Sequence, residues 1–547
     1  MGSYTNTKKS EVNKTRLNNL LKLTFIFILV LSTYPLQFEK VQAQTQDLPT
    51  NLHLTWQNDT STTITITWQT NSSTSGDIVL YDQTSKLGEE SEYQYSATGD
   101  HFTYEGASGY IHNVELVNLT PDTIYYFMCG GPTGGYSKER SFRTSPSVSS
   151  DVRFVVGGDS RSNVKERENI SVAMARVNPS LVLHVGDMIY DGRVQSQWDR
   201  WFTDLDSNWI GDNNLTIPII PVLGNHEHPE RPDNKYFVQF ALPGNEKWFS
   251  LNWGPDIHII CLDNSYILDD ISGPQRDWLE NDLAIHAGYL WTFVVFHVPP
   301  FVTGPESAGE WFERRVREHW VPLFDKYHVD IVFSGHVHNY QRTHPINWTD
   351  SQTEPQDYSN GTMYIISGGW GAPLTALRPV SYMAYQNKTY HFCVVDVSKN
   401  GTLHLQAKDN LGNTIDEVTI YKTPAAFALS SLTVDPLSIE EGGTVTISCD
   451  VANTGGHTGS HTITLKIDGE VEDETTITLS PDETVTISFE VLTIQEGSYS
   501  VDVNGMSGNY TVTKPSIWDL IPGFPYEAII LGLVAGAFIL WLMQRRQ

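Results

Sequence analysis

Basic residues are scarce in this sequence of 547 residues. Lys and Arg together number 35, against 64 Asp and Glu, which gives a formal net charge of −29. A surface of that sign repels the phosphate backbone of a nucleic acid. We therefore expect no nucleic acid polymer among the partners of this protein.

Cysteine is scarce as well. The chain has four cysteines, and they are widely spread: Cys129, Cys261, Cys393 and Cys449. A small secreted protein held together by disulfides would show a denser pattern, so disulfides are not the framework of this fold. A single bridge between Cys261 and Cys393 stays open.

Long apolar runs lie near the two ends of the chain. Residues 1–43 combine several Lys and Arg with the apolar run LTFIFILVLS and the small-residue ending Val41-Gln42-Ala43. This order is typical of a secretory signal peptide, and an uncleaved N-terminal anchor is the alternative. In both cases the body of the protein is exported.

The second apolar run, residues 526–543, is long enough for one transmembrane helix. Arg545 and Arg546 follow it directly, which indicates a short cytoplasmic tail and places the rest of the chain outside a cell membrane that it crosses once. Gly532 and Gly536 could bring two such helices together in a homodimer, although glycine is also simply tolerated in membrane helices. The Pro-rich residues 514–525 predict a stalk, and about ten Asn-x-Ser/Thr sites, including Asn58 and Asn509, fit an exported glycoprotein.

Hydrophobic residues make up 39% of the chain, enough for about three to four domains. Residues 46–145 and 428–513 both show short alternating runs divided by turn residues, such as TTITITWQT, and each predicts a β-sandwich. The first resembles a fibronectin type III module, with Tyr125 of LTPDTIYYF as its corner tyrosine. The second resembles the immunoglobulin-like, adhesion-type repeats of prokaryotic cell surfaces.

Residues 151–423 change to apolar strands followed by helical stretches, for example VRFVV and then VKERENISVAMARV. This alternation predicts an α/β domain with a mixed sheet covered by helices. Polar side chains follow its strands, at the position where open α/β sheets bind their ligands.

Five short motifs in this region carry such side chains. Taken alone, an Asp after a strand is more often a turn residue or helix cap, and a single His beside prolines is more often a core residue. Together they supply oxygen and imidazole donors for two metal ions that share a carboxylate. The motifs are GGDSR with Asp159, GDMIY with Asp187 and Tyr190, GNHE with Asn225, His226 and Glu227, VVFH with His297, and GHVH with His336 and His338.

In this order the five motifs resemble calcineurin-like metallophosphoesterases, and GDMIY is the purple acid phosphatase version. The runs IHNVELVNLTPDTIYYFMCG, SGPQRDWLENDL and VDIVFSGHVHNYQRTHPI extend the likeness over roughly residues 50–420. The resemblance implies a four-layer α/β domain with a binuclear metal centre. It assigns the first metal to Asp159, Asp187, Tyr190 and His338, and the second to Asn225, His297, His336 and a bridging Asp187.

The resemblance also implies how the site works. A phenolate from Tyr190 favours Fe(III), and the second metal would be Fe(II), Zn or Mn. A metal-bound hydroxide would attack the phosphate ester, with His226 as the catalytic residue beside it and Asn225 and His226 near the substrate. The alternative role of His226 is to orient the Asn225 loop.

The sequence departs from the family in two places. Plant-type members have a pair of adjacent histidines after the VxxH histidine, and this chain continues VPPFVTGPESAGEW. Arg161 stands where the family has glycine. We hypothesise that Arg161 contacts the substrate phosphate, because a guanidinium can form two hydrogen bonds to it; an exposed or carboxylate-paired arginine is the alternative.

The sequence thus predicts a membrane-anchored extracellular phosphatase that hydrolyses small phosphate monoesters. A phosphodiesterase or nucleotide pyrophosphatase using the same metals is the alternative among enzymes. A catalytically silent surface adhesion protein is the alternative from another class.

Overall fold

A computed structural model describes residues 47–545 except 74–75, 228–230, 232, 266–270, 304–309, 349–356, 494 and 515–525. The predicted signal peptide at 1–43 and all but the first residue of the predicted stalk at 514–525 lie outside the described residues.

The first part of the chain is a β-sandwich, as predicted. The run TTITITWQT forms strand β2, whose side chains join a buried core with Trp56, Trp68 and Phe127. Tyr125 forms the expected corner, because its hydroxyl accepts a hydrogen bond of 2.9 Å from the backbone N–H of Thr120. One sheet has the order β1-β2-β6-β5, and the other has β4-β3-β7-β8 with β9 beside β7. The strands are β1 (Thr50–Thr55), β2 (Ile64–Thr70), β3 (Ile78–Asp82), β4 (Tyr95–Thr98), β5 (Asp100–Phe102), β6 (Tyr110–Leu116), β7 (Ile124–Gly131), β8 (Gly135–Tyr136) and β9 (Arg140–Arg143), with a 3₁₀ turn η1 (Glu90–Glu92).

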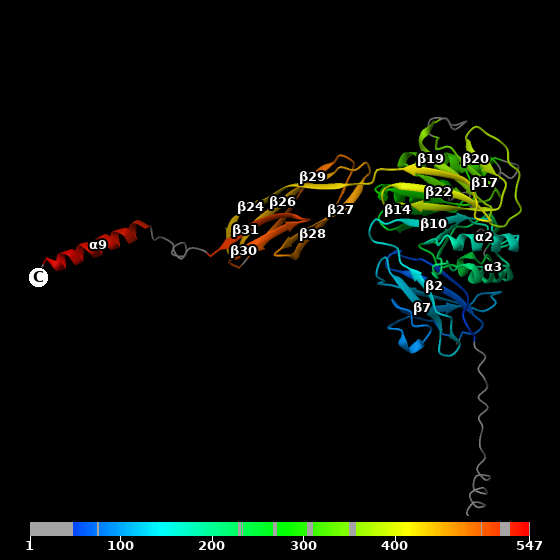
Figure 1. Cartoon of the computed structure of the whole chain (residues 1–547), viewed down its shortest axis with the longest axis horizontal. Helices are drawn as coiled ribbons and strands as arrows, with labels where there is room; N and C mark the ends of the chain where they lie inside the picture. Colours follow the sequence, from blue (N-terminus) through cyan, green and yellow to red (C-terminus); the bar gives the residue numbers. More distant parts are fainter. Residues whose placement is uncertain are drawn as a thin grey trace, which may run out of the picture. The chain divides into compact units, whose positions relative to one another are not determined.

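The α/β domain contains two packed sheets. The first has the order β12-β11-β10-β21-β22-β23, and its strands β10, β11 and β12 are parallel. Strands β10 and β22 of this sheet are labelled in Figure 1. Its elements are β10 (Val152–Gly157), α2 (Val164–Arg176), β11 (Val182–His184), α3 (Gln195–Asn208), β12 (Ile219–Pro221), η2 (Asn225–Glu227), α4 (Tyr236–Gln239), β21 (His391–Val397), β22 (Thr402–Asp409) and β23 (Thr414–Tyr421).

The second sheet has the order β13-β14-β15-β16-β19-β17-β20, with β18 paired to β19. Strands β14, β15, β16 and β19 run parallel to one another. Its elements are β13 (Phe249–Trp253), β14 (Ile257–Cys261), α6 (Pro274–Ile285), β15 (Trp291–Val295), α7 (Glu310–His319), α8 (Val321–Tyr327), β16 (Ile331–Ser334), β17 (Tyr340–Thr343), β18 (Ile346–Asn347), β19 (Asp357–Ser367) and β20 (Met383–Asn387).

Side-chain alternation in the strands produces the layers of this domain. Phe293 and Phe333 of the second sheet pack against Phe154 of the first, with ring centroids 5.3 and 6.5 Å away. Their neighbours Val294 and Val332 point the other way, into a core shared with α6, α7 and α8. Helices α2 and α3 contribute to the core of the first sheet. The predicted α/β domain, with helices outside two sheets, is confirmed.

The third part is again a β-sandwich, with sheets β24-β26-β29 and β25-β31-β30-β27-β28. Its core includes Val445, Ile447, Leu465 and Phe489. The strands are β24 (Phe427–Asp435), β25 (Ser438–Glu440), β26 (Gly443–Asn453), β27 (Gly459–Ile467), β28 (Glu470–Leu479), β29 (Thr484–Thr493), β30 (Gly497–Val503) and β31 (Met506–Thr513).

Two sequence expectations are not supported. A helix, α9 (Tyr526–Gln544), forms at the predicted membrane span, but its side chains are described only from Ile530 onward. Over the described part of the chain no helix is long and apolar enough to cross a membrane. The bridge between Cys261 and Cys393 is not formed: all four cysteines are free and buried, and these two lie on β14 and β21 of different sheets.

Candidate metal centre

Parallel strands bring the five sequence motifs to one edge of the α/β domain. Asp159 and Asp187 follow β10 and β11, and Asn225 begins η2 after β12. In the second sheet His297 follows β15 and His336 follows β16. Because each group of strands is parallel, their carboxyl ends and the side chains that follow them meet at the same edge.

Three of these residues have left-handed backbone. The φ angles are 60° at Asp159, 57° at Asp187 and 66° at His336. For residues with a Cβ this conformation costs about 1–2 kcal/mol each, and it is found mainly at sites that use it. Backbone hydrogen bonds hold the turns: the Asp159 N–H donates to the Gly186 carbonyl (2.9 Å), and the His336 N–H donates to Asp159 Oδ2 (2.9 Å).

His297 presents an imidazole lone pair to two oxygens. Its Nδ1 lies 2.8 Å from the Val185 carbonyl, which can only accept, so Nδ1 carries the proton. Nε2 then faces Asp187 Oδ1 at 3.2 Å and Asn225 Oδ1 at 3.1 Å. His336 Nδ1 also lies 2.9 Å from that amide oxygen. Electron-rich atoms face one another here, which a cation between them would stabilise.

His338 repeats this arrangement on the other side of the group. Its Nδ1 donates to the Pro373 carbonyl (2.8 Å), and its Nε2 faces Asp159 Oδ1 at 3.3 Å. Asp159 Oδ1 is buried and has no hydrogen-bond donor. Ligand atoms of Asp159, Asp187 and His297 all lie within 4.8 Å of one another. The donor set therefore fits metal ions, with six of the seven predicted ligands facing the same group.

Tyr190 is the predicted ligand that the structure places on the rim instead. Its side chain is 60% exposed, and its ring centroid lies 5.2 Å from that of His226. The Arg161 guanidinium lies 5.7 Å from the Tyr190 ring centroid. The phenol thus borders the ligand group from the solvent side.

Arg161 contacts the predicted metal ligands. Its Nε lies 3.4 Å from Asp187 Oδ2, and a terminal nitrogen donates to His338 Nε2 at 3.2 Å. The carboxylate-paired alternative from the sequence is therefore what the structure shows for Arg161.

His226 lies beside the same carboxylate. Its Nδ1 is 2.5 Å from the Tyr190 carbonyl, and its Nε2 is 3.8 Å from Asp187 Oδ2. Its side chain is 22% exposed. Burial, with repulsion from Arg161, lowers the pKa of His226 below its ordinary value of 6.5, although Asp187 acts against this.

The charges at the centre are strongly coupled. Burial disfavours the charged form of His297, but attraction by Asp187 outweighs it and raises the pKa of His297 to about 9. The pKa of Asp187 lies well below its usual range: burial would raise it, and His297 lowers it more strongly. With no metal between them, a proton on His297 would take the place of the cation.

Glu227 of the GNHE motif lies behind the ligands, a position that the sequence does not indicate. It is fully buried and accepts hydrogen bonds from three backbone N–H groups: Asp187 (2.9 Å), Met188 (2.9 Å) and Gly224 (2.6 Å). Burial and the charge of Asp187 raise the pKa of Glu227 to about 8, while the backbone donors act the other way. Glu227 therefore ties together the two loops that carry Asp187 and Asn225.

A cleft of about 550 Å³ opens beside the ligand group. Arg161 and Tyr190 line it on the side of the metal ligands, and Gln197 and Arg200 line it further along α3. This position suits the part of a substrate that is not the reacting phosphate.

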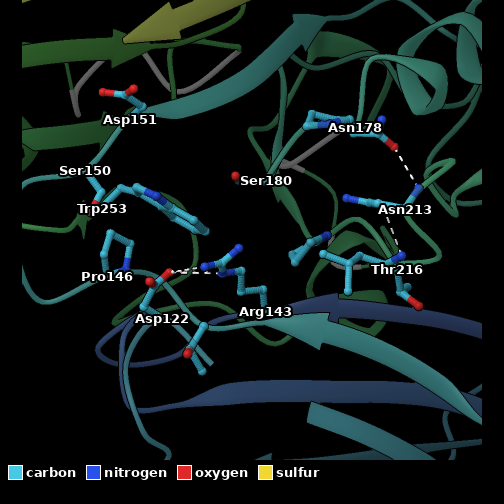
Figure 2. A pocket seen from close by; sticks show the side chains of 14 residues that line it. Asp122, Arg143, Pro146, Ser150, Asp151, Asn178, Ser180, Asn213, Thr216 and Trp253 are labelled. Carbon is cyan, nitrogen blue, oxygen red and sulfur yellow. Dashed lines mark hydrogen bonds and ion pairs between the residues drawn. The ribbon is translucent and has the colours of Figure 1, made fainter. Parts of the chain in front are cut away.

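A second cavity, of about 390 Å³, lies between the first sandwich and the α/β domain. Figure 2 shows Arg143 of the sandwich paired with Asp122 at its wall, with Trp253 of the α/β domain nearby. Its lining shares no residue with the metal-ligand group. We therefore assign the chemistry to the group of predicted ligands at the strand ends, which we call the strand-end cluster: Asp159, Asp187, Asn225, His297, His336 and His338.

Comparisons with known proteins identify the three domains of the chain. The family model for the purple acid phosphatase N-terminal domain matches residues 49–144, that for calcineurin-like phosphoesterases matches 153–340, and the CARDB model matches 427–512. An uncharacterised protein of Mycobacterium tuberculosis is 27% identical over 323 residues, covering 49% of this chain and 59% of that protein. Purple acid phosphatase 15 of Arabidopsis thaliana is 30% identical over 307 residues, covering 48% of this chain and 54% of that enzyme.

The chain thus spans a little over half the length of these curated relatives. Among solved structures, a purple acid phosphatase from yellow lupin (Lupinus luteus) seeds superposes with a TM-score of 0.58 at 22% identity, covering 69% of this chain and 74% of that one. That likeness concerns the fold. Two adjacent family matches over residues 49–340, together with this fold, give the chain the domain make-up of a purple acid phosphatase-like metallophosphoesterase.

Proposed function

We propose that this protein hydrolyses phosphate monoesters at two metal ions held by the strand-end cluster. The observation that carries the proposal is the pair of imidazole Nε2 atoms, on His297 and His338, that face carboxylate oxygens with their protons held on the opposite nitrogen. Such an arrangement is built to surround cations.

The proposed ligands follow the two halves of the cluster. Asp159, Asp187 and His338 would hold one metal, with Tyr190 at its solvent side, and Asp187, Asn225, His297 and His336 would hold the other. Bound there, the two ions would lower the pKa of a water molecule and neutralise phosphoryl oxygens. We propose Fe(III) on the tyrosine side and Fe(II), Zn or Mn on the other, because phenolate favours the harder ion.

The protein's own side chains would bind the substrate. Arg161 reaches the ligand group from the cleft and can donate two hydrogen bonds to a phosphate. His226 Nε2 lies 3.8 Å from the Asp187 oxygen that Arg161 also contacts, where it could donate to a phosphoryl or leaving-group oxygen. Asn225, between His297 and His336, would meet the substrate at the second metal.

Metal analysis and hydrolysis assays on the purified full chain test the proposal. We expect about two metals per chain and faster hydrolysis of a monoester than of a diester. His297→Ala should lose metal and activity, whereas His404→Ala, on the exposed face of β22, should keep both. A chain that binds no metal would support the silent adhesion protein, and a preference for diesters would support the phosphodiesterase.

The cellular setting remains a prediction from the sequence. Export follows from residues 1–43, and the glycosylation sites agree with it. Attachment to a membrane and pairing into a homodimer rest on the apolar C-terminal segment alone. Glycosidase treatment and fractionation of cells that produce the full chain would test the location.

A further inference from the structure

A second group of metal-binding side chains lies in the first sandwich. His101 on β5 and His112 on β6 are directly opposite each other in the antiparallel pair, so their side chains project from the same face. Asp77, just before β3, reaches the same point from the other sheet. Ligand atoms of the three residues lie within 4.8 Å of one another.

Both imidazoles face one carboxylate through Nδ1. His112 Nδ1 lies 2.6 Å from Asp77 Oδ1. His101 Nδ1 lies 3.0 and 2.9 Å from the two oxygens of Asp77. The group therefore offers two imidazole nitrogens and a carboxylate at one point.

Thr70 contacts the other ring nitrogen of His112. The Thr70 hydroxyl can donate its single hydrogen to the Ser72 carbonyl at 3.0 Å. It lies 2.6 Å from His112 Nε2 and can accept from it when that nitrogen carries the ring proton. In this tautomer the Nδ1 lone pair faces the Asp77 oxygen, and a cation between them would be attracted by both.

The ring of His112 is fixed by its surroundings. It is fully buried and stacks on Trp68, with centroids 5.1 Å apart and an interplanar angle of 3°. Its Nδ1 is therefore held in one direction, toward Asp77.

We propose that Asp77, His101 and His112 bind a divalent transition metal, Zn²⁺ in the first place, that joins the two sheets of the first sandwich. Two imidazoles and a carboxylate are typical zinc ligands. The side chains of Asp77 and His101 are 20% and 31% exposed, which leaves a fourth position for water. Thr70 and Trp68 fix the orientation of His112 from behind.

A third group of His and Asp side chains differs from the Asp77 group in its hydrogen bonds. His258, Asp282 and His286 also lie within 4.8 Å of one another. There the Nδ1 of His286 donates to the backbone carbonyl of Asp282 (2.8 Å), and Asp282 also accepts from Ser250 (2.8 Å). This group is satisfied by its own hydrogen bonds, so we assign it no metal.

The test uses the full chain with its catalytic metals loaded. Zn²⁺ is added, excess is removed by gel filtration, and metals per chain are counted by mass spectrometry. We expect one zinc more in the wild type than in His101→Ala, and a zinc-dependent rise in the melting temperature of the wild type that His101→Ala lacks. His404→Ala is the matched control and should behave as the wild type.

Two further variants separate this site from the catalytic one. Thr70→Val keeps all three ligands and should weaken zinc binding about 10- to 100-fold, because Nε2 of His112 loses its acceptor. His297→Ala should lose catalytic metal but keep the extra zinc. Equal zinc content and equal melting behaviour in the wild type and His101→Ala would overturn the proposal and leave a hydrogen-bonded group only.

Discussion

Nε of Arg161 lies 3.4 Å from Oδ2 of Asp187, the carboxylate proposed to bridge the two metals. Arg161 is also the residue at which the first motif departs from the pattern usual in the family that the sequence resembles. Once cations occupy the ligand group, they repel the guanidinium, and an anion between them and Arg161 would be attracted by both. This relationship makes Arg161 the side chain whose removal tells most about the substrate.

Arg161→Ala should raise KM for a phosphomonoester by about 10- to 100-fold, since hydrogen bonds to a charged group contribute about 1.5–3 kcal/mol. Metal content should stay at two per chain, because Arg161 is not a ligand. Arg193→Ala, which removes the exposed partner of Asp191, is the control and should leave KM unchanged. Unchanged kinetics in Arg161→Ala would remove Arg161 from the substrate site.

Tyr190→Phe tests the identity of the first metal. If the phenolate binds Fe(III), the iron-loaded protein absorbs visible light through the tyrosinate-to-iron transition, and the variant loses this band. Tyr95→Phe, which changes another exposed tyrosine far from the strand-end motifs in the sequence, should keep it. Iron-loaded wild type without the band would show that Tyr190 stays on the rim, where the structure places it.

Glu227→Gln tests whether this carboxylate positions the ligand loops. The amide cannot accept from all three backbone N–H groups without presenting its own N–H₂ to one of them. We expect metal affinity about 10- to 100-fold weaker, as is typical when a partner behind the ligands is lost. Equilibrium competition with a chelator measures this change. The half-buried Glu246→Gln serves as control, and equal affinities in all three proteins would contradict the positioning role.

The sequence alone predicts that apolar strands alternate with helices in the α/β domain and which polar motifs follow those strands, because alternation and strand-end position are local properties. Arg161 shows the limit of what local sequence can predict. That an arginine replaced glycine is readable, but its contacts with Asp187 and His338 depend on loops that only the packed sheets bring together.

Pairings between distant segments cannot be predicted from the sequence either. His101 and His112 stand in unremarkable strands, and nothing local sets the register that places them opposite each other. The sequence leaves a bridge between Cys261 and Cys393 open, because it does not say which sheet each strand joins. It does not indicate the role of Glu227 either, since two of its backbone donors come from another loop.

The contribution of the Asp282 group to stability should depend on pH. Asp282 accepts from His258 Nε2 (2.8 Å) and lies 3.3 Å from His286 Nδ1. Burial would raise the pKa of Asp282, but the hydrogen bonds from His258 and His286 outweigh it and hold the pKa well below 3.8. The hydrogen bond that His286 donates to the Asp282 carboxylate raises the pKa of His286 above 6.5.

The two shifts define a pH window. A depressed carboxyl pKa stabilises the fold above pH 3.8 and loses this effect as the pH falls below it. A raised histidine pKa stabilises the fold fully below pH 6.5 and loses this effect as the pH rises through the folded value. Asp282 should therefore contribute most between about pH 4 and 6.5, where the carboxylate and the charged His286 coexist.

Asp282→Ala should destabilise the α/β domain by about 3–5 kcal/mol at pH 5.5, because it leaves a buried histidine without its partner, and by less at pH 8.5. Calorimetry at the two pH values measures this difference. The unfolding transition of the α/β domain is the one whose temperature shifts when the catalytic metals are added. His286→Ala should remove the pH-dependent part of the difference while keeping the bond from His258 to Asp282. A loss of stability that is the same at both pH values would show that the charge on His286 plays no part.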